Sequence, residues 1–184
     1  MSTTPPHNDT YLESREIEAQ ARKEDSPQQW LQFAELKDSK GSYGPATAGY
    51  LNAGIAFERD GDAASAIDAY RRGLDVAQKA KHSESVVILS MRLVPLLERT
   101  ERFDEAGALY EALSAYYAEQ ESWFLAADAA DHAAELFGKA GRDLSSYTLP
   151  AELWTRNAEY WAGKDKGDEA WSRRRAAVYL ENTK

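Results

Sequence analysis

Residues 57–70 read FERDGDAASAIDAY, and residues 97–110, forty positions later, read LERTERFDEAGALY. Both stretches open on a large apolar residue, carry an alanine nine positions later and close on a tyrosine. A period of about 40 residues is typical of stacked helical repeats. A small side chain lets two helix backbones approach, and an aromatic residue one turn later lies on the same face. We therefore expect these alanines at close helix crossings and these tyrosines buried beside them, at Ala66, Tyr70, Ala106 and Tyr110.

Apolar residues recur at helical spacing along the chain, and no stretch alternates as a strand would. The pattern predicts nine helices, at residues 10–24, 26–38, 45–60, 62–80, 83–100, 103–120, 122–140, 148–163 and 167–181. Ser26 and Asp62 are expected to cap the second and fourth of these. The predicted fold class is all-α, a right-handed α-solenoid of about four helical hairpins with a C-terminal capping helix.

The domain prediction is a disordered lead-in over residues 1–9 and one repeat domain over residues 10–184. Terminal units of solenoids need a polar outer face. On the capping helix we expect Trp171, Val178 and Leu180 to cover the last hairpin, while its charged residues stay in water.

The spacing of eight residues in the middle of the chain resembles a tetratricopeptide repeat: Tyr50, Ala53, Gly54, Phe57, Gly61, Ala66, Tyr70 and Gly73. The stretch RFDEAGALY, at 102–110, is similar to the start of the second helix of that repeat. The standard period is about 34 residues, so the hairpins here are longer. Longer hairpins, and the Ala-rich stretch AADAADHAAELFGKAGR at 126–142, resemble the soluble NSF attachment proteins. The tail ENTK lacks the acidic, leucine-containing end that this family uses on its ATPase, so we do not carry over that role.

Composition excludes several classes of function. The formal net charge of −9 argues against general nucleic-acid binding and against adhesion to an anionic membrane, and it gives a mild preference for basic protein partners. With no cysteine, the chain has no disulfide framework, thiolate zinc site or cysteine nucleophile. No apolar run approaches a membrane span, and MSTTPPHNDT lacks the blocks of a signal peptide, so the cytoplasm is the expected location.

The resemblance implies that the first helix of each hairpin lines a concave groove. Asn52, Arg92 and His132 recur there at steps of 40, and Arg presents a planar fork of donors that suits a peptide backbone or carboxylate. A second column, also at a step of 40, contains Glu58 and Glu98, and Arg59 and Arg99 follow them directly in the sequence. The alternative reading of both columns is ordinary surface charge. Pro95 predicts a kink that either shapes a pocket with Met91 and Arg92 or follows the superhelix.

Four residues with metal-binding side chains share one predicted helix face at positions i, i+3, i+4 and i+7: Asp128, Asp131, His132 and Glu135. They form either a solvated or partner-facing acidic stripe or a metal site. A di-metal bundle needs Glu-x-x-His on two helices, and no second such helix occurs in the sequence. Phosphate loops and G-x-S-x-G motifs are also missing. We therefore expect no catalysis, no cofactor and no metal.

The sequence thus predicts a non-catalytic protein- or peptide-binding adaptor or scaffold. Its groove is expected along helices 45–60, 83–100 and 122–140, with nine candidate residues: Asn52, Glu58, Arg59, Met91, Arg92, Arg99, Asp128, Asp131 and His132. One alternative is a self-associating module whose C-terminal Trp-rich helices pair two chains. Another is a metal-dependent or small-molecule-binding helical protein centred on His132.

Overall fold

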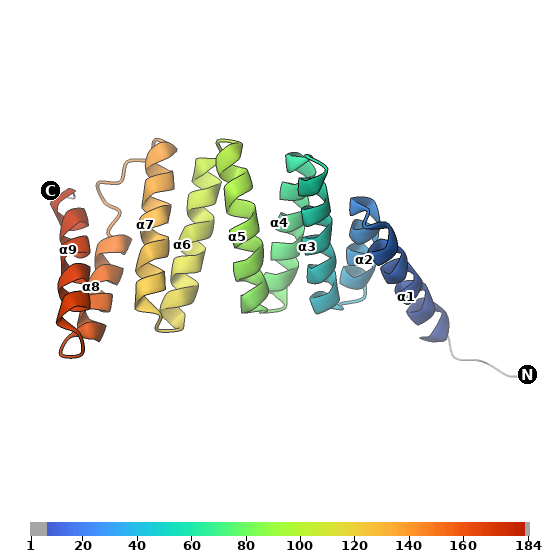
Figure 1. Cartoon of the computed structure of the whole chain (residues 1–184), viewed down its shortest axis with the longest axis horizontal. Coiled ribbons are helices and arrows are strands. Elements are labelled where there is room, and N and C mark those ends of the chain that lie inside the picture. The colour runs from blue at the N-terminus through green and yellow to red at the C-terminus, as the bar shows by residue number, and fades with distance from the viewer. Residues whose placement is uncertain (1–6, 183–184) are drawn as a thin grey trace, which may run out of the picture. The chain divides into compact units, whose positions relative to one another are not determined.

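A computed structural model describes residues 7–182 of the chain, with side chains for residues 15–181. Over this range the fold is all-α (Figure 1), which confirms the predicted class. The nine helices found there lie within a few residues of the predicted ones: α1 (His7–Glu24), α2 (Pro27–Ser39), α3 (Tyr43–Arg59), α4 (Ala63–Lys79), α5 (Ser83–Arg99), α6 (Phe103–Glu119), α7 (Trp123–Lys139), α8 (Leu149–Trp161) and α9 (Lys166–Asn182). The predicted disordered lead-in falls on residues 1–6, which lie outside the described residues, and on residues 7–9, where α1 has already begun.

The turns that follow helices α2 to α7 repeat every twenty residues. After α3, Gly61 has φ +80°, the Gly61 N–H donates to the Glu58 carbonyl at 3.1 Å, and the Asp62 N–H donates to the Phe57 carbonyl at 2.9 Å. These two bonds satisfy helix carbonyls that would otherwise lack partners. The same left-handed turn position recurs along the chain, at Gly41, Gly61, Lys81, Glu101, Glu121 and Gly141.

This turn geometry explains the 40-residue period seen in the sequence. Helices α3 to α7 each span 17 residues, and three-residue turns separate them, so each helix begins twenty residues after the previous one. One hairpin therefore occupies two such units. Asp62 caps α4 as predicted, because its carboxylate accepts from the Ser65 N–H at 3.0 Å. The predicted Ser26 cap is not made: Ser26 precedes Pro27 at the start of α2, but its side chain caps no backbone N–H.

The chain divides into two compact units, residues 1–96 and 97–184, and the boundary lies within α5. In the first unit α1 packs on α2, α2 on α3 and α3 on α4. In the second unit α6 packs on α7, α7 on α8 and α8 on α9. Within each unit, then, consecutive helices lie side by side, as short connections require (Figure 1). The prediction of one continuous repeat domain stays a prediction.

Small residues allow the close helix approaches of the first unit. Ala66 is fully buried, as expected, and the ring of Tyr70 is buried with it. The closest approach is made by Gly54, because a Cβ at this position of α3 would overlap the Tyr70 ring of α4. Between the same two helices, a Cβ at Gly73 of α4 would lie 3.0 Å from Tyr50 Cβ of α3. Glycine rather than alanine therefore sets the tightest contacts.

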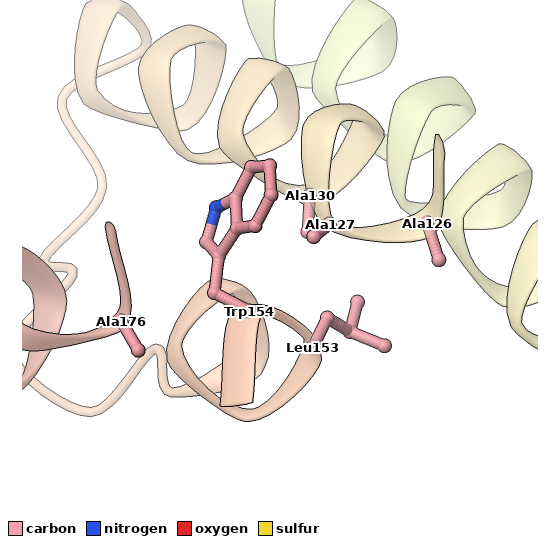
Figure 2. Packing of buried hydrophobic residues seen from close by; sticks show 6 residues of the cluster. All are labelled: Ala126, Ala127, Ala130, Leu153, Trp154 and Ala176. Atoms are coloured by element: carbon pink, nitrogen blue, oxygen red, sulfur yellow. The ribbon is translucent and has the colours of Figure 1, made fainter. Parts of the chain in front are cut away.

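The second unit uses the same principle with different residues. Ala106 is fully buried, but Tyr110 is half-buried, so the expectation of full burial is only partly met there. The close approach is at Gly107, where a Cβ would lie 2.6 Å from two atoms of the Phe137 ring. Further along, Trp154 points from α8 toward Ala127 and Ala130 of α7 (Figure 2), and it is 1% exposed.

The C-terminal helix packs only partly as predicted. Ser172 and Ala176 are its buried residues, and Arg175 and Tyr179 are half-buried on the same side. Of the expected covering residues, Val178 and Leu180 are each 49% exposed, whereas Trp171, although 40% exposed, packs against Phe124 of α7 and Trp154 of α8. The small Ser172 also faces α8, where its hydroxyl accepts a hydrogen bond from Asn157 Nδ2 at 2.8 Å. None of the described helices is both long enough and apolar enough to cross a membrane.

Candidate functional site

The candidate groove residues fall into two groups, one in each compact unit. Five belong to the first unit, on α3 and α5: Asn52, Glu58, Arg59, Met91 and Arg92. Four belong to the second unit. Arg99 is the last residue of α5, and the other three lie on α7: Asp128, Asp131 and His132. The prediction that they line one shared groove stays a prediction, and the surface of each unit has its own chemistry.

In the first unit α5 presents apolar side chains and a cation to solvent. Ile88 is 42% exposed and Met91 is 53% exposed, and Arg92 beside them is also exposed. These residues share one helix face because they are three and four positions apart. Among the described residues, Arg92 has no hydrogen-bond or ion-pair partner, and it interacts electrostatically with the Tyr70 phenol. The side opposite this face is buried, with Leu89 and Leu93 in the core.

Tyr70 of α4 and Glu58 of α3 join these two helices in the same unit. The Tyr70 hydroxyl donates a hydrogen bond to the Glu58 carboxylate. Burial, with the adjacent Glu58 as the second cause, raises the pKa of the Tyr70 phenol far above its ordinary value. Glu58 was predicted as a ligand residue, and here it anchors a buried tyrosine. Arg92 lies near enough to favour the phenolate electrostatically.

Arg59 has a structural partner in Asp25, which lies in the turn between α1 and α2. Its guanidinium donates to the Asp25 carboxylate and to the Asp25 backbone carbonyl, the latter at 2.8 Å. Trp30 Nε1 also donates to that carboxylate at 3.2 Å. The hydrogen bond from Trp30, and then the one from Arg59, lower the pKa of Asp25. Arg59 therefore ties the end of α3 to the α1–α2 turn, while Asn52 is half-buried on α3.

The second unit contains a related arrangement forty residues on. The rings of Tyr110 and His132 stack with centroids 5.0 Å apart and an interplanar angle of 25°. Burial, and then the charges of Glu98 and Asp128, raise the pKa of Tyr110. Asp128 Oδ2 lies 3.8 Å from His132 Nε2. Tyr110, Glu98 and His132 thus lie forty residues after Tyr70, Glu58 and Arg92. The two columns read from the sequence did not show that the tyrosine connects the glutamate and the basic residue.

Asp131 was predicted as a groove residue, and the structure gives it interior partners. Its side chain is 11% exposed, and it accepts a hydrogen bond from Trp154 Nε1 at 2.9 Å. Arg175 of α9 donates to the same carboxylate, and this bond is the main cause that raises the pKa of the guanidinium. A hydrogen bond to Asp131, after burial itself, raises the pKa of Tyr179. Asp131 therefore holds α8 and α9 against α7.

An aromatic cluster lies beside this network, and the sequence analysis considered only its tryptophans, as part of a possible self-association surface. Phe124 stacks on Trp171 with ring centroids 5.9 Å apart and an angle of 26°. The buried Trp154 meets both rings edge-on, at 5.7 Å from Phe124 and 4.8 Å from Trp171. Phe124 is 48% exposed. The tryptophans were the available signal, but a single sequence does not show which aromatic rings remain at the surface.

The described side chains offer little that resembles a catalytic or metal centre. No three of the His, Asp and Glu residues among them come together in a way that could hold a metal ion. A hollow of about 600 Å³ runs beside α8, between apolar residues such as Leu149 and Leu180 and the Arg156–Glu159 ion pair. The Thr155 hydroxyl in this hollow donates a hydrogen bond to the Ala151 carbonyl of the same helix at 2.8 Å, so its proton is already used within α8.

Comparisons with known proteins give no assignment. No family model matches the sequence, and no curated protein matches it. Among solved structures the chain is similar to one described as "Crystal structure of BtubC (BKLC) from P. vanneervenii", with a TM-score of 0.33 and 12% sequence identity. That alignment covers 94% of this chain and 88% of the other. A TM-score this low supports no argument about function.

Proposed function

We propose that this chain is a non-catalytic protein- or peptide-binding module, an adaptor or scaffold. Its helices would form a right-handed tetratricopeptide-like array, in which α3, α5 and α7 present the binding faces. The regular 17-residue helices, the twenty-residue spacing and the small residues at close crossings support this arrangement. The resemblance of residues 50–73 to a tetratricopeptide repeat supports it as well.

The exposed face of α5 is the observation that carries the proposal. Ile88 and Met91 leave apolar area in water beside Arg92, which has no internal ion pair among the described residues. Met and Arg are enriched where proteins bind one another. This face suits an apolar peptide side chain accompanied by a carboxylate or by backbone carbonyl groups, which the Arg92 fork can bind.

A crosslinking experiment followed by titration tests this function. A photoreactive amino acid at Met91 would capture a partner in extracts of the source cells, and the purified partner would then be titrated with variants. We expect Met91→Ala with Arg92→Ala to weaken binding at least tenfold, as hot-spot residues do. The triple variant Asn52→Ala, Arg92→Ala, His132→Ala should weaken it at least as much.

The control is Lys79→Ala on α4, an exposed cation away from the α5 face, and it should leave the affinity unchanged. Unchanged binding by both groove variants would rule out this face as the site. Self-association through the C-terminal aromatic residues is the alternative, favoured by the exposure of Tyr160 and Trp171. Light scattering across a concentration series separates the two, because a monomer at all concentrations removes the alternative.

A further inference from the structure

We propose that the Phe124–Trp171 pair in the second unit is a subsite for an arginine side chain of a basic partner segment, with Asp128 as its counter-ion. This inference rests on the proposed partner-binding function and specifies the chemistry of a partner for the second unit. The two rings stack on each other, are 48% and 40% exposed, and come from α7 and α9. Asp128 lies one helical turn from Phe124 on the same face of α7.

The two rings are packed against a buried support. Both rest on Trp154, which is 1% exposed and meets each of them edge-on. The Asp131 carboxylate fixes the Trp154 indole through a 2.9 Å hydrogen bond (Figure 2 shows how Trp154 is packed). A planar cation could therefore stack on a preformed aromatic surface, with little loss of side-chain freedom on the protein side.

The chemistry of these rings favours a cation. An arginine guanidinium or lysine ammonium over an aromatic face is attracted by the ring electrons. The chain uses this interaction elsewhere in the same unit: Arg142 lies 3.9 Å from the Phe137 ring centre and Lys164 lies 3.6 Å from that of Tyr160. Among the described residues no cation lies over the Phe124 ring, which leaves its exposed face for a partner.

Charge complementarity selects the occupant. The chain carries a formal net charge of −9, so a basic segment is attracted over long range. Asp128 is half-exposed, and His132 Nε2 lies 3.8 Å from its carboxylate. Arg175 faces the same region, but Asp131 engages it directly. Arginine suits the site better than lysine because its plane can stack on a ring while its donors reach a carboxylate.

Fluorescence anisotropy with a designed probe tests this. The probe is a labelled peptide in which arginine alternates with Gly-Ser pairs, compared at low salt with matched peptides that carry lysine or glutamate instead. We expect the arginine peptide to bind several-fold more tightly than the lysine peptide, and the glutamate peptide not to bind. Trp171→Ala should weaken the arginine peptide about tenfold, and Asp128→Asn about three- to fivefold.

Two matched controls lie in the first unit: Tyr43→Ala, an exposed aromatic residue, and Asp75→Asn, an exposed carboxylate. Both should leave binding unchanged. Asp128→Asn also guards against misfolding, since this side chain is outside the core. Equal binding by wild type, Trp171→Ala and Asp128→Asn would overturn the proposal, as would a lack of arginine-peptide binding.

A second copy of the chain is the competing occupant. If light scattering shows a dimer that Trp171→Ala converts to a monomer, the face is a self-association surface and the proposal is wrong. Crosslinking at Met91 distinguishes these failures from failure of the general function, because Met91 lies in the other unit. If a partner is still crosslinked at Met91 while the arginine peptide does not bind, the adaptor function is supported and this subsite is not.

Discussion

Replacing the non-glycine residues of the left-handed turns by glycine should stabilise the protein. Lys81, Glu101 and Glu121 have φ values of 57°, 56° and 54°, at the turn position where Gly61 has φ +80°. A side chain in this conformation costs roughly 1–2 kcal/mol. Glycine avoids that strain but loses about 0.5–1 kcal/mol more conformational freedom on folding. Each substitution should therefore raise the free energy of unfolding by about 0.5–1 kcal/mol.

The three turns are separated by whole helices, so their effects should add. The triple variant should then gain about 1.5–3 kcal/mol, which for a chain of this size raises Tm by roughly 3–12 °C. Urea unfolding followed by far-ultraviolet circular dichroism measures the gain, and a thermal scan gives Tm. No helix contact changes, so the slope of unfolding free energy against urea should stay constant.

Two controls separate turn strain from a general effect of glycine. Gly61→Ala places a side chain at φ +80° and should lower the free energy of unfolding by about 1–2 kcal/mol. Lys79→Gly, at the last residue of α4, should lower it by about 0.5–1 kcal/mol. If the triple glycine variant were less stable than wild type, the left-handed turns would not exist in solution, and the twenty-residue unit would lose its basis.

Three further changes test the packing and the charge network. Gly54→Ala should destabilise the protein by about 1–3 kcal/mol in urea unfolding, because the added methyl group overlaps the Tyr70 ring. Asp131→Ala should cost about 2–3 kcal/mol, because Trp154 Nε1 loses its acceptor, whereas Asp128→Ala should stay within about 0.5 kcal/mol. The lowered pKa of Asp25 adds stability above about pH 4 that disappears as pH falls further. Asp25→Asn should therefore flatten the acid side of a stability–pH curve, and an unchanged curve would contradict the role of its hydrogen bonds.

Local features were predictable from the sequence because they depend on neighbours along the chain. The helix limits followed from apolar spacing, glycine turns and proline starts, and Asp62 caps α4 as expected. The burial of Ala66 and Tyr70 followed from the period alone. The exposure of Val178 and Leu180 has a physical cause: periodicity places a residue on a helix face, but the size of the facing residues decides which face packs.

The candidate site was less predictable. The columns through Arg92 and His132 identified residues on exposed helix surfaces. They could not show that Glu58 and Asp131 are engaged by Tyr70 and Trp154, because hydrogen bonds between distant side chains depend on tertiary geometry. The aromatic pair was hidden for the same reason, since exposure is a property of the packed molecule.

The sequence by itself determined an all-helical chain with a forty-residue rhythm, because helix propensity, turn chemistry and apolar spacing act over a few residues. The tertiary structure alone decided which charged groups serve as internal anchors and which remain open at the surface. That division depends on which helices meet and how closely. A glycine such as Gly54 admits a ring from the next helix, and the ring then engages the carboxylate within reach of its hydroxyl.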